Sequence, residues 1–143
     1  MDIRLSFPPE PRNAPALAQI AVEAAREISG FELDYTPLSL ILVDEQVGRL
    51  SASDVGVEGV ASTLFCLGCY VGEVLVKSLA GVWLPTEQTS LDGLAAWPMV
   101  VCTPNGSCWN PIGKVFKRFE DGESEGLRDF FHTAAEYARR EKH

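Results

Sequence analysis

The stretch FCLGCYVGEVLVKSLAGVW (residues 65–83) decides the fold, because it belongs to the most apolar segment of the chain. Apolar residues begin near Val57 and continue to Leu79, so we predict one helix over this range. A helix that is apolar on most of its sides is usually covered by other elements. We therefore expect this helix at the centre of the protein. Gly68 and Gly72 share one of its faces and would let another helix approach closely.

Four further helices are expected, and capping residues mark where they begin and end. Thr36 can accept a hydrogen bond from the first free amides of a helix, and Pro37 suits the first helical position. Gly30 and Gly81 are expected to end the helices before them. The four helices cover about residues 14–29, 36–50, 111–121 and 125–140.

Two of these helices carry charged residues that we expect on their outer faces. In the helix over residues 36–50, the buried stripe recurs at spacings of three and four residues and excludes the charged positions. The stripe consists of Leu40, Val43, Val47 and Leu50. The residues expected outside are Asp44, Glu45 and Arg49 in this helix, and Lys114, Lys117 and Arg118 in the helix over residues 111–121.

A β-hairpin is predicted at residues 99–110, around the turn Thr103-Pro104-Asn105-Gly106. Proline suits the second position of such a turn, and glycine supplies the positive φ that follows. A three-residue loop would set Cys102 directly opposite Cys108. With a short strand at residues 82–84, the fold class is α+β: about five helices around a central apolar helix, and a two- or three-stranded antiparallel sheet. Residues 1–13 are expected to form an extended lead-in, and residues 14–143 a single domain.

The chain is acidic, with 20 Asp and Glu against 12 Lys and Arg and a net charge of −8. Such a chain lacks the basic footprint of a nucleic-acid-binding protein. The N-terminus has no basic start followed by an apolar run, and the uncharged apolar run at residues 59–72 has only 14 residues. A membrane span needs about 20 mostly apolar residues. We therefore expect a cytoplasmic protein with neither a membrane nor a nucleic acid as partner.

The acidity is concentrated in one segment. Between residues 30 and 60, six acidic residues face a single basic residue, Arg49. A basic protein surface would be attracted there. Besides Glu32, the acidic residues are Asp34, Asp44, Glu45, Asp54 and Glu58, and these five are the predicted partner surface.

The four cysteines could in principle bind zinc, since Cys66, Cys69, Cys102 and Cys108 form the spacing C-x2-C-x32-C-x5-C. The first two could also form a redox pair. Their apolar neighbours and their place inside a helix weigh against both interpretations. Cysteine is also among the residues most often fully buried. We therefore expect the first two to be core thiols and no cofactor to be bound. The second two are expected as free thiols, with a cross-strand disulfide as the alternative.

Glu73 is a lone carboxylate among apolar residues of the central helix, and it would be costly to bury without partners. It could serve as a metal ligand or as a general acid. It could instead accept structural hydrogen bonds from a turn, from the indole of Trp83 or Trp109, or from Lys114, and this is the interpretation that we favour. A further alternative is a small-molecule pocket around Glu73, lined by Tyr70, Trp83, Trp97 and Trp109.

The sequence favours a protein without catalysis, and no catalytic residue is assigned. His132 falls on an exposed helix face and His143 is the last residue, so neither offers a base to a Ser or Cys nucleophile. The chain has no phosphate-binding glycine motif of the G-x-x-x-x-G-K or G-x-G-x-x-G kind.

The central segment resembles a family of small bacterial domains of unknown function. Its signature is a G-x-Y-x-G-E helix followed, after about seven residues, by a G-x-W strand. The resemblance covers about residues 33–120, including the LDYTPLSL segment at residues 33–40 and a P-x-x-K-V-F-K tail. It implies a bacterial origin and a fold, but no activity, and the cysteines are not part of the pattern. The matching residues are Gly68, Tyr70, Gly72, Glu73, Gly81 and Trp83, with Pro111, Val115, Phe116 and Lys117 in the tail.

These observations lead to three hypotheses. The first is a non-catalytic cytoplasmic interaction domain of a bacterium, of the immunity or adaptor kind, whose acidic surface meets a basic protein partner. The second is a zinc- or thiol-dependent protein that uses the four cysteines. The third is a small-molecule-binding protein with its pocket around Glu73. Nothing in the sequence indicates the oligomeric state.

Overall fold

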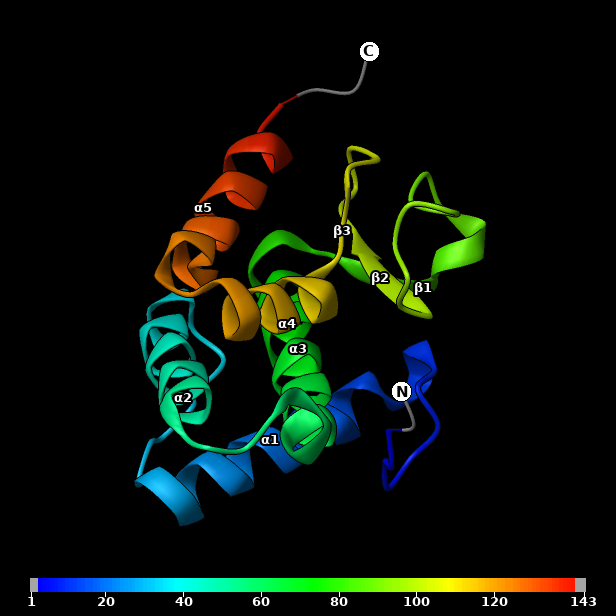
Figure 1. The fold of residues 1–143 in the computed structure, drawn as a ribbon. Helices are drawn as coiled ribbons and strands as arrows, with labels where there is room; N and C mark the ends of the chain where they lie inside the picture. Colours follow the sequence, from blue (N-terminus) through cyan, green and yellow to red (C-terminus); the bar gives the residue numbers. More distant parts are fainter. Residues whose placement is uncertain (1–2, 141–143) are drawn as a thin grey trace.

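Five α-helices and one three-stranded sheet make up residues 3–140, the part of the chain that the computed structural model describes. In Figure 1, α3 (Val57–Leu79) runs through the middle of the protein. The prediction of an α+β fold around one apolar helix is confirmed. The other helices are α1 (Ala14–Ser29), α2 (Leu40–Ala52), α4 (Pro111–Asp121) and α5 (Leu127–Ala138).

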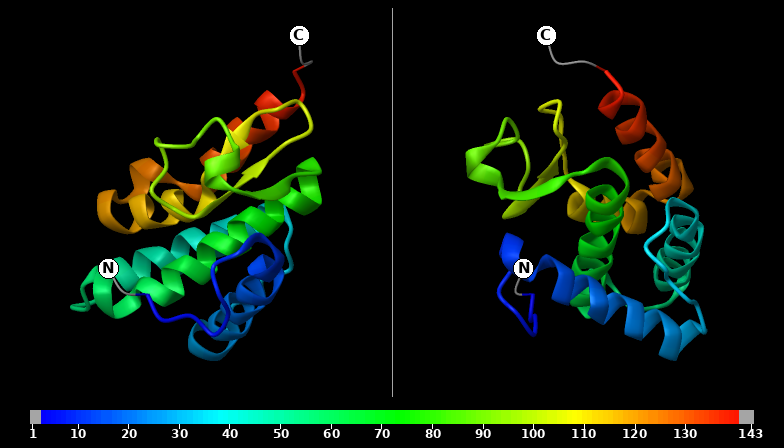
Figure 2. Two further views of the ribbon diagram at one scale, coloured as in Figure 1. Left: turned by 90° about the vertical axis from the view of Figure 1, so that its right-hand side faces the viewer. Right: turned by 180° about the vertical axis from the view of Figure 1, so that it is seen from behind.

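The central helix α3 is covered mainly by α1 on one side and α4 on another, as the two views in Figure 2 show. Gly68 makes the contact with α4 close, because a Cβ atom there would lie 2.6 Å from the Cα of Ile112. By length and composition alone, α3 could cross a membrane, but 78% of its most apolar stretch is buried within the protein.

Helix α3 ends at Leu79, as predicted, but its cap differs from the prediction. The residue in the left-handed conformation is Ala80, with φ of 56°, and not Gly81. Gly81 is needed for another reason, since a Cβ atom there would lie 2.6 Å from a methyl group of Val101 on the sheet. Packing against the sheet, rather than the helix cap, therefore explains this glycine.

The sheet has the order β1 (Val82–Pro85), β2 (Met99–Cys102) and β3 (Cys108–Trp109), and all its pairs are antiparallel. The predicted hairpin forms, with Cys102 directly opposite Cys108. The Thr103 amide donates to the Ser107 carbonyl oxygen at 2.8 Å and closes the three-residue loop.

Short 3-10 helices connect the longer elements. One of them, η2 (Pro37–Ser39), precedes α2, and the Thr36 hydroxyl accepts a hydrogen bond from the Ser39 amide, as expected of a cap. Another, η4 (Glu123–Glu125), occupies the place where the last helix was expected to start, so α5 begins two residues later. The remaining two are η1 (Pro11–Asn13) and η3 (Thr86–Gln88).

Candidate functional site

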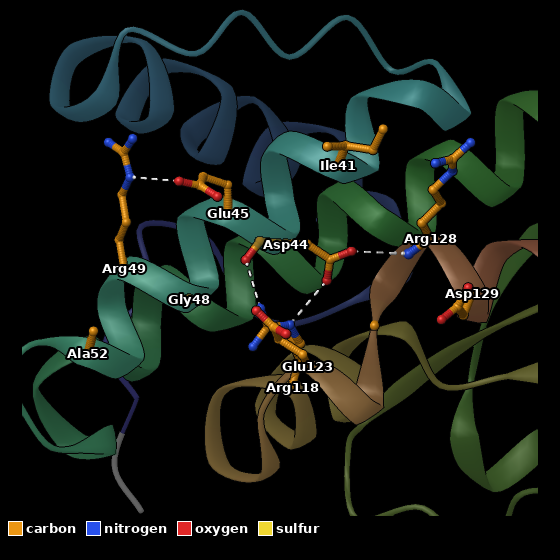
Figure 3. Close-up of a pocket in the computed structure, with 11 residues that line it drawn as sticks. Ile41, Asp44, Glu45, Gly48, Arg49, Ala52, Arg118, Glu123, Arg128 and Asp129 are labelled. Atoms are coloured by element: carbon orange, nitrogen blue, oxygen red, sulfur yellow. Dashed lines mark hydrogen bonds and ion pairs between the residues drawn. The ribbon is translucent and has the colours of Figure 1, made fainter.

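A charged cleft of about 610 Å³ lies between α2 and the start of α5 (Figure 3). One wall comes from α2, and the other from α4, the turn before α5 and the first turn of α5. Its charged lining residues are the acids Asp44, Glu45, Glu123 and Asp129 and the arginines Arg49, Arg118 and Arg128.

Asp44 joins the three helices around this cleft. One carboxylate oxygen accepts from Arg118 Nε at 3.2 Å and from the Leu127 amide at 2.9 Å. The other accepts from the Arg128 amide at 3.3 Å. Asp44 therefore satisfies free amides at the start of α5, where the helix dipole favours a negative charge. Its carboxylate is engaged within the protein and contributes little negative charge to the surface.

Sequence reasoning placed Arg118 on the outer face of its helix, and this prediction is wrong. Arg118 is only 6% exposed, because it lies between α4 and α2 and also donates to the Asp44 carbonyl oxygen at 3.2 Å. Lys114, also expected outside, is half-buried and paired with Glu125. Lys117 is exposed, as predicted.

The other predicted partner-surface residues remain at the surface. Glu45 pairs with Arg49 at 3.4 Å. Asp34, Asp54 and Glu58 are exposed and form no salt bridge within residues 3–140. Because Asp34 precedes α2 and the other two follow it, the uncompensated charge lies near both ends of this helix.

A second hollow, the Leu38 groove, lies beside the charged cleft and has a volume of about 360 Å³. Ile41 lines both hollows, so together they form one continuous surface along α2. Sequence reasoning missed this groove, although Leu38 and Ile41 fall outside the predicted buried stripe, a signal that could have indicated exposed apolar residues. The groove is lined by Glu32, Asp34, Thr36, Leu38, Ser39, Ile41 and Leu42.

Glu73 has a structural partner. It is 5% exposed and accepts a hydrogen bond from Trp83 Nε1 at 3.0 Å. The Trp83 ring lies against Gly72, where any Cβ atom would overlap it. The favoured interpretation of Glu73, a carboxylate that accepts from an indole, is confirmed for Trp83.

Tyr70 is fully buried and fixes the segment before α2. Its hydroxyl accepts from the Tyr35 amide at 2.8 Å and lies 2.6 Å from the Ser39 hydroxyl. Ser39 donates to the Thr36 carbonyl oxygen, so Tyr70 donates to Ser39. Burial raises the pKa of the Tyr70 phenol. The hydroxyl is engaged in structure and does not face a pocket.

The tryptophans proposed for an aromatic pocket lie in separate places. Trp83 contacts Glu73, and Trp97 packs between Phe65 and Phe116. Trp109 packs edge-on against α5 aromatic rings, and its indole nitrogen is buried without a partner among the described residues. The structure therefore does not gather Tyr70, Trp83, Trp97 and Trp109 around Glu73.

The cysteines are also divided. Cys102 and Cys108 form a disulfide, which corrects the expectation of two free thiols. The two residues are direct partners in the pairing of β2 and β3, and this brings their sulfur atoms together. Cys66 and Cys69 are buried free thiols, and burial raises the pKa of Cys66 to about 11 and that of Cys69 further. Within residues 3–140, no three His, Cys, Asp or Glu side chains gather where they could hold a metal ion.

His132 lies exposed on α5, as predicted, beside Phe131. His143 falls outside the described residues.

No protein-family model, curated protein or solved structure matches this chain. The similarity to the G-x-Y-x-G-E family therefore remains a prediction from the residues.

Proposed function

We propose that this protein is a non-catalytic bacterial interaction domain that binds a basic protein partner through its α2 face. An adaptor or immunity protein would act in this way. The observation that carries the proposal is the composition of the two hollows along α2. Six carboxylates line them against three arginines, and exposed apolar side chains lie between.

The charges of this face suit attraction over a distance. Thr36 holds the pKa of Asp34 below its usual value by hydrogen bonding, so this carboxylate stays ionised to a lower pH than an ordinary aspartate. Exposed carboxylates accelerate association with a basic surface, and salt weakens the effect because the Debye length falls to about 8 Å at physiological ionic strength.

The two alternative functions find less support. A small-molecule pocket needs Glu73 open to a cavity, whereas this carboxylate is buried and bonded to Trp83. A zinc site needs thiolates from both cysteine pairs, whereas Cys102 and Cys108 are joined to each other.

Affinity capture from a bacterial lysate with the full chain as bait tests the proposal. A variant that neutralises the uncompensated acids, Asp34→Asn with Asp54→Asn and Glu58→Gln, keeps the size of each side chain. We expect a basic partner that binds the wild type in low salt with an association rate at least about fivefold above that of the variant.

The matched control neutralises three exposed acids elsewhere, Glu87→Gln with Asp92→Asn and Glu136→Gln. It should retain the wild-type association rate within about twofold. Capture of no basic protein in low salt would contradict the proposal. So would a captured partner whose association rate is equal for both triple variants.

A further inference from the structure

The Leu38 groove exposes apolar side chains on a rigid support. Leu38 is 66% exposed and Ile41 43% exposed. Their neighbours Ser39 and Leu40 are buried, Ser39 through its bond to the Tyr70 hydroxyl and Leu40 in the core. Because these neighbours are fixed inward, Leu38 and Ile41 are held on the outer side without having to rearrange on binding.

The acidic residues of the groove are also placed before any partner arrives. Both hydrogen bonds that hold the Asp34 carboxylate end on Oδ1, from the Thr36 amide at 3.1 Å and the Thr36 hydroxyl at 2.6 Å. Its Oδ2 atom has no hydrogen-bond partner among residues 3–140. Glu32 lines the same groove and pairs with Arg26 at 3.1 Å. Asp34 is therefore the carboxylate that is ready to bind a cation.

We propose that the Leu38 groove receives a short segment of a partner protein that carries an apolar side chain flanked by Lys or Arg. The apolar side chain packs on Leu38 and Ile41, and a flanking cation pairs with Asp34. This inference rests on the proposed function and names its partner chemistry. Charge complementarity selects a basic segment, because the groove supplies two carboxylates and no cation.

The surface has room for more than one contact. Ile41 continues the groove into the charged cleft, where Glu45 lies one helical turn further along α2. From Leu38 to Glu45 the distance along the helix is roughly 11 Å. An extended segment covers that distance with about three residues. A second cation of the same segment can therefore reach Glu45, near the middle of α2, and share its carboxylate with Arg49.

The test uses a random dodecapeptide library displayed on phage and panned against the full chain. We expect enriched peptides to share an apolar residue next to Lys or Arg, and their amide chemical-shift changes to fall in residues 32–45. The double variant Leu38→Ser with Ile41→Ser should weaken binding of these peptides at least about tenfold, and Asp34→Asn about threefold.

The control is Leu94→Ser, because Leu94 is 80% exposed and lies outside both hollows. It should bind the peptides as the wild type does. Lack of enrichment, an acidic consensus, or equal binding to the double variant and the control would overturn the inference. So would a dimer of the full chain that dissociates in the double variant, since a second copy would then fill the groove.

The two proposals can fail separately. If lysate capture yields a basic partner that binds the Leu38→Ser, Ile41→Ser variant normally, the interaction function stands and the groove is excluded. If selected peptides bind the groove but no basic cellular protein is captured, the partner chemistry stands and the proposed function falls.

Discussion

Glu73 and Trp83 are the pair through which the central helix holds the edge of the sheet. The indole of Trp83 donates to the buried carboxylate, and its ring lies on the space that Gly72 leaves open. Tyr70, on the same helix, holds Tyr35 and Ser39 in the segment before α2. The residues of the G-x-Y-x-G-E and G-x-W pattern therefore have structural partners inside the protein, which explains why these residue types occur at this spacing.

Replacing Trp83 by Phe should destabilise the protein by about 2 kcal/mol, because a buried carboxylate loses its hydrogen-bond donor. Urea denaturation measures the loss. The double variant Glu73→Leu with Trp83→Phe should be more stable than Trp83→Phe alone, since both polar partners are then replaced by apolar groups. Losses that simply add would show that the two residues are not coupled.

At the scale of elements, α5 makes side-chain hydrogen bonds to other segments at both of its ends. Asp44 of α2 accepts from the Leu127 and Arg128 amides at its start. At its end, the Asn105 side chain of the hairpin loop donates to the Tyr137 carbonyl oxygen at 2.6 Å. The loop is in turn closed by the Cys102–Cys108 disulfide. The position of α5, and with it one wall of the charged cleft, thus depends on two distant segments.

Asp44→Ala should lower the free energy of unfolding by about 3 kcal/mol, because Arg118 then remains buried without its counter-charge and α5 loses its cap. This value lies at the lower end of the range for buried pairs, since Asp44 is partly exposed. Urea denaturation measures the change. The control is Asp54→Ala, an exposed loop position, with an expected change within about 0.5 kcal/mol. Equal losses in the two variants would contradict the role of Asp44.

Reduction of the Cys102–Cys108 disulfide should cost about 2 kcal/mol of stability, the chain-entropy value for a loop as short as residues 102–108. Hydrogen exchange should become faster in the hairpin and in the last turn of α5, while α2 amides stay protected. The variant Asn105→Ala, which keeps the disulfide, should reproduce the faster exchange of α5 alone. An unchanged melting temperature after reduction would show that the disulfide does not support the fold.

At the scale of the whole molecule, net charge opposes compactness. A chain of this length has a radius of gyration of about 15 Å, so most pairs of its charges lie within one Debye length at 0.01 M salt, where that length is about 30 Å. The net charge of −8 then produces self-repulsion across the protein. The ion pairs among residues 3–140 are mostly exposed and contribute little in return.

Raising NaCl from about 0.01 M to about 0.15 M should therefore raise the melting temperature by a few degrees, because the Debye length falls to about 8 Å. Calorimetry measures the shift. The variant Glu87→Lys with Glu136→Lys changes two exposed residues and reduces the net charge from −8 to −4. Its melting temperature should depend less on salt. The same salt dependence in both proteins would exclude self-repulsion as the cause.

The elements of this fold were predictable because their signals are local. The apolar run over α3, the cap at Thr36 and the turn at Thr103–Gly106 each depend on residues only a few positions apart. Hydrophobic spacing and turn chemistry act over such short distances. Helix caps and starts were less predictable: Ala80 rather than Gly81 takes the left-handed conformation after α3, and α5 begins two residues later than expected because η4 precedes it.

The sequence by itself thus determined the central helix, its flanking helices, the hairpin register and the acidic segment. Only the tertiary structure decided that Asp44 and Arg118, 74 residues apart, bind each other, and that Leu38 and Ile41 line a groove beside Asp34. The reason is physical: a side chain's burial and charge partners depend on which elements pack together, and spacing along one helix carries no information about the residue that approaches from another.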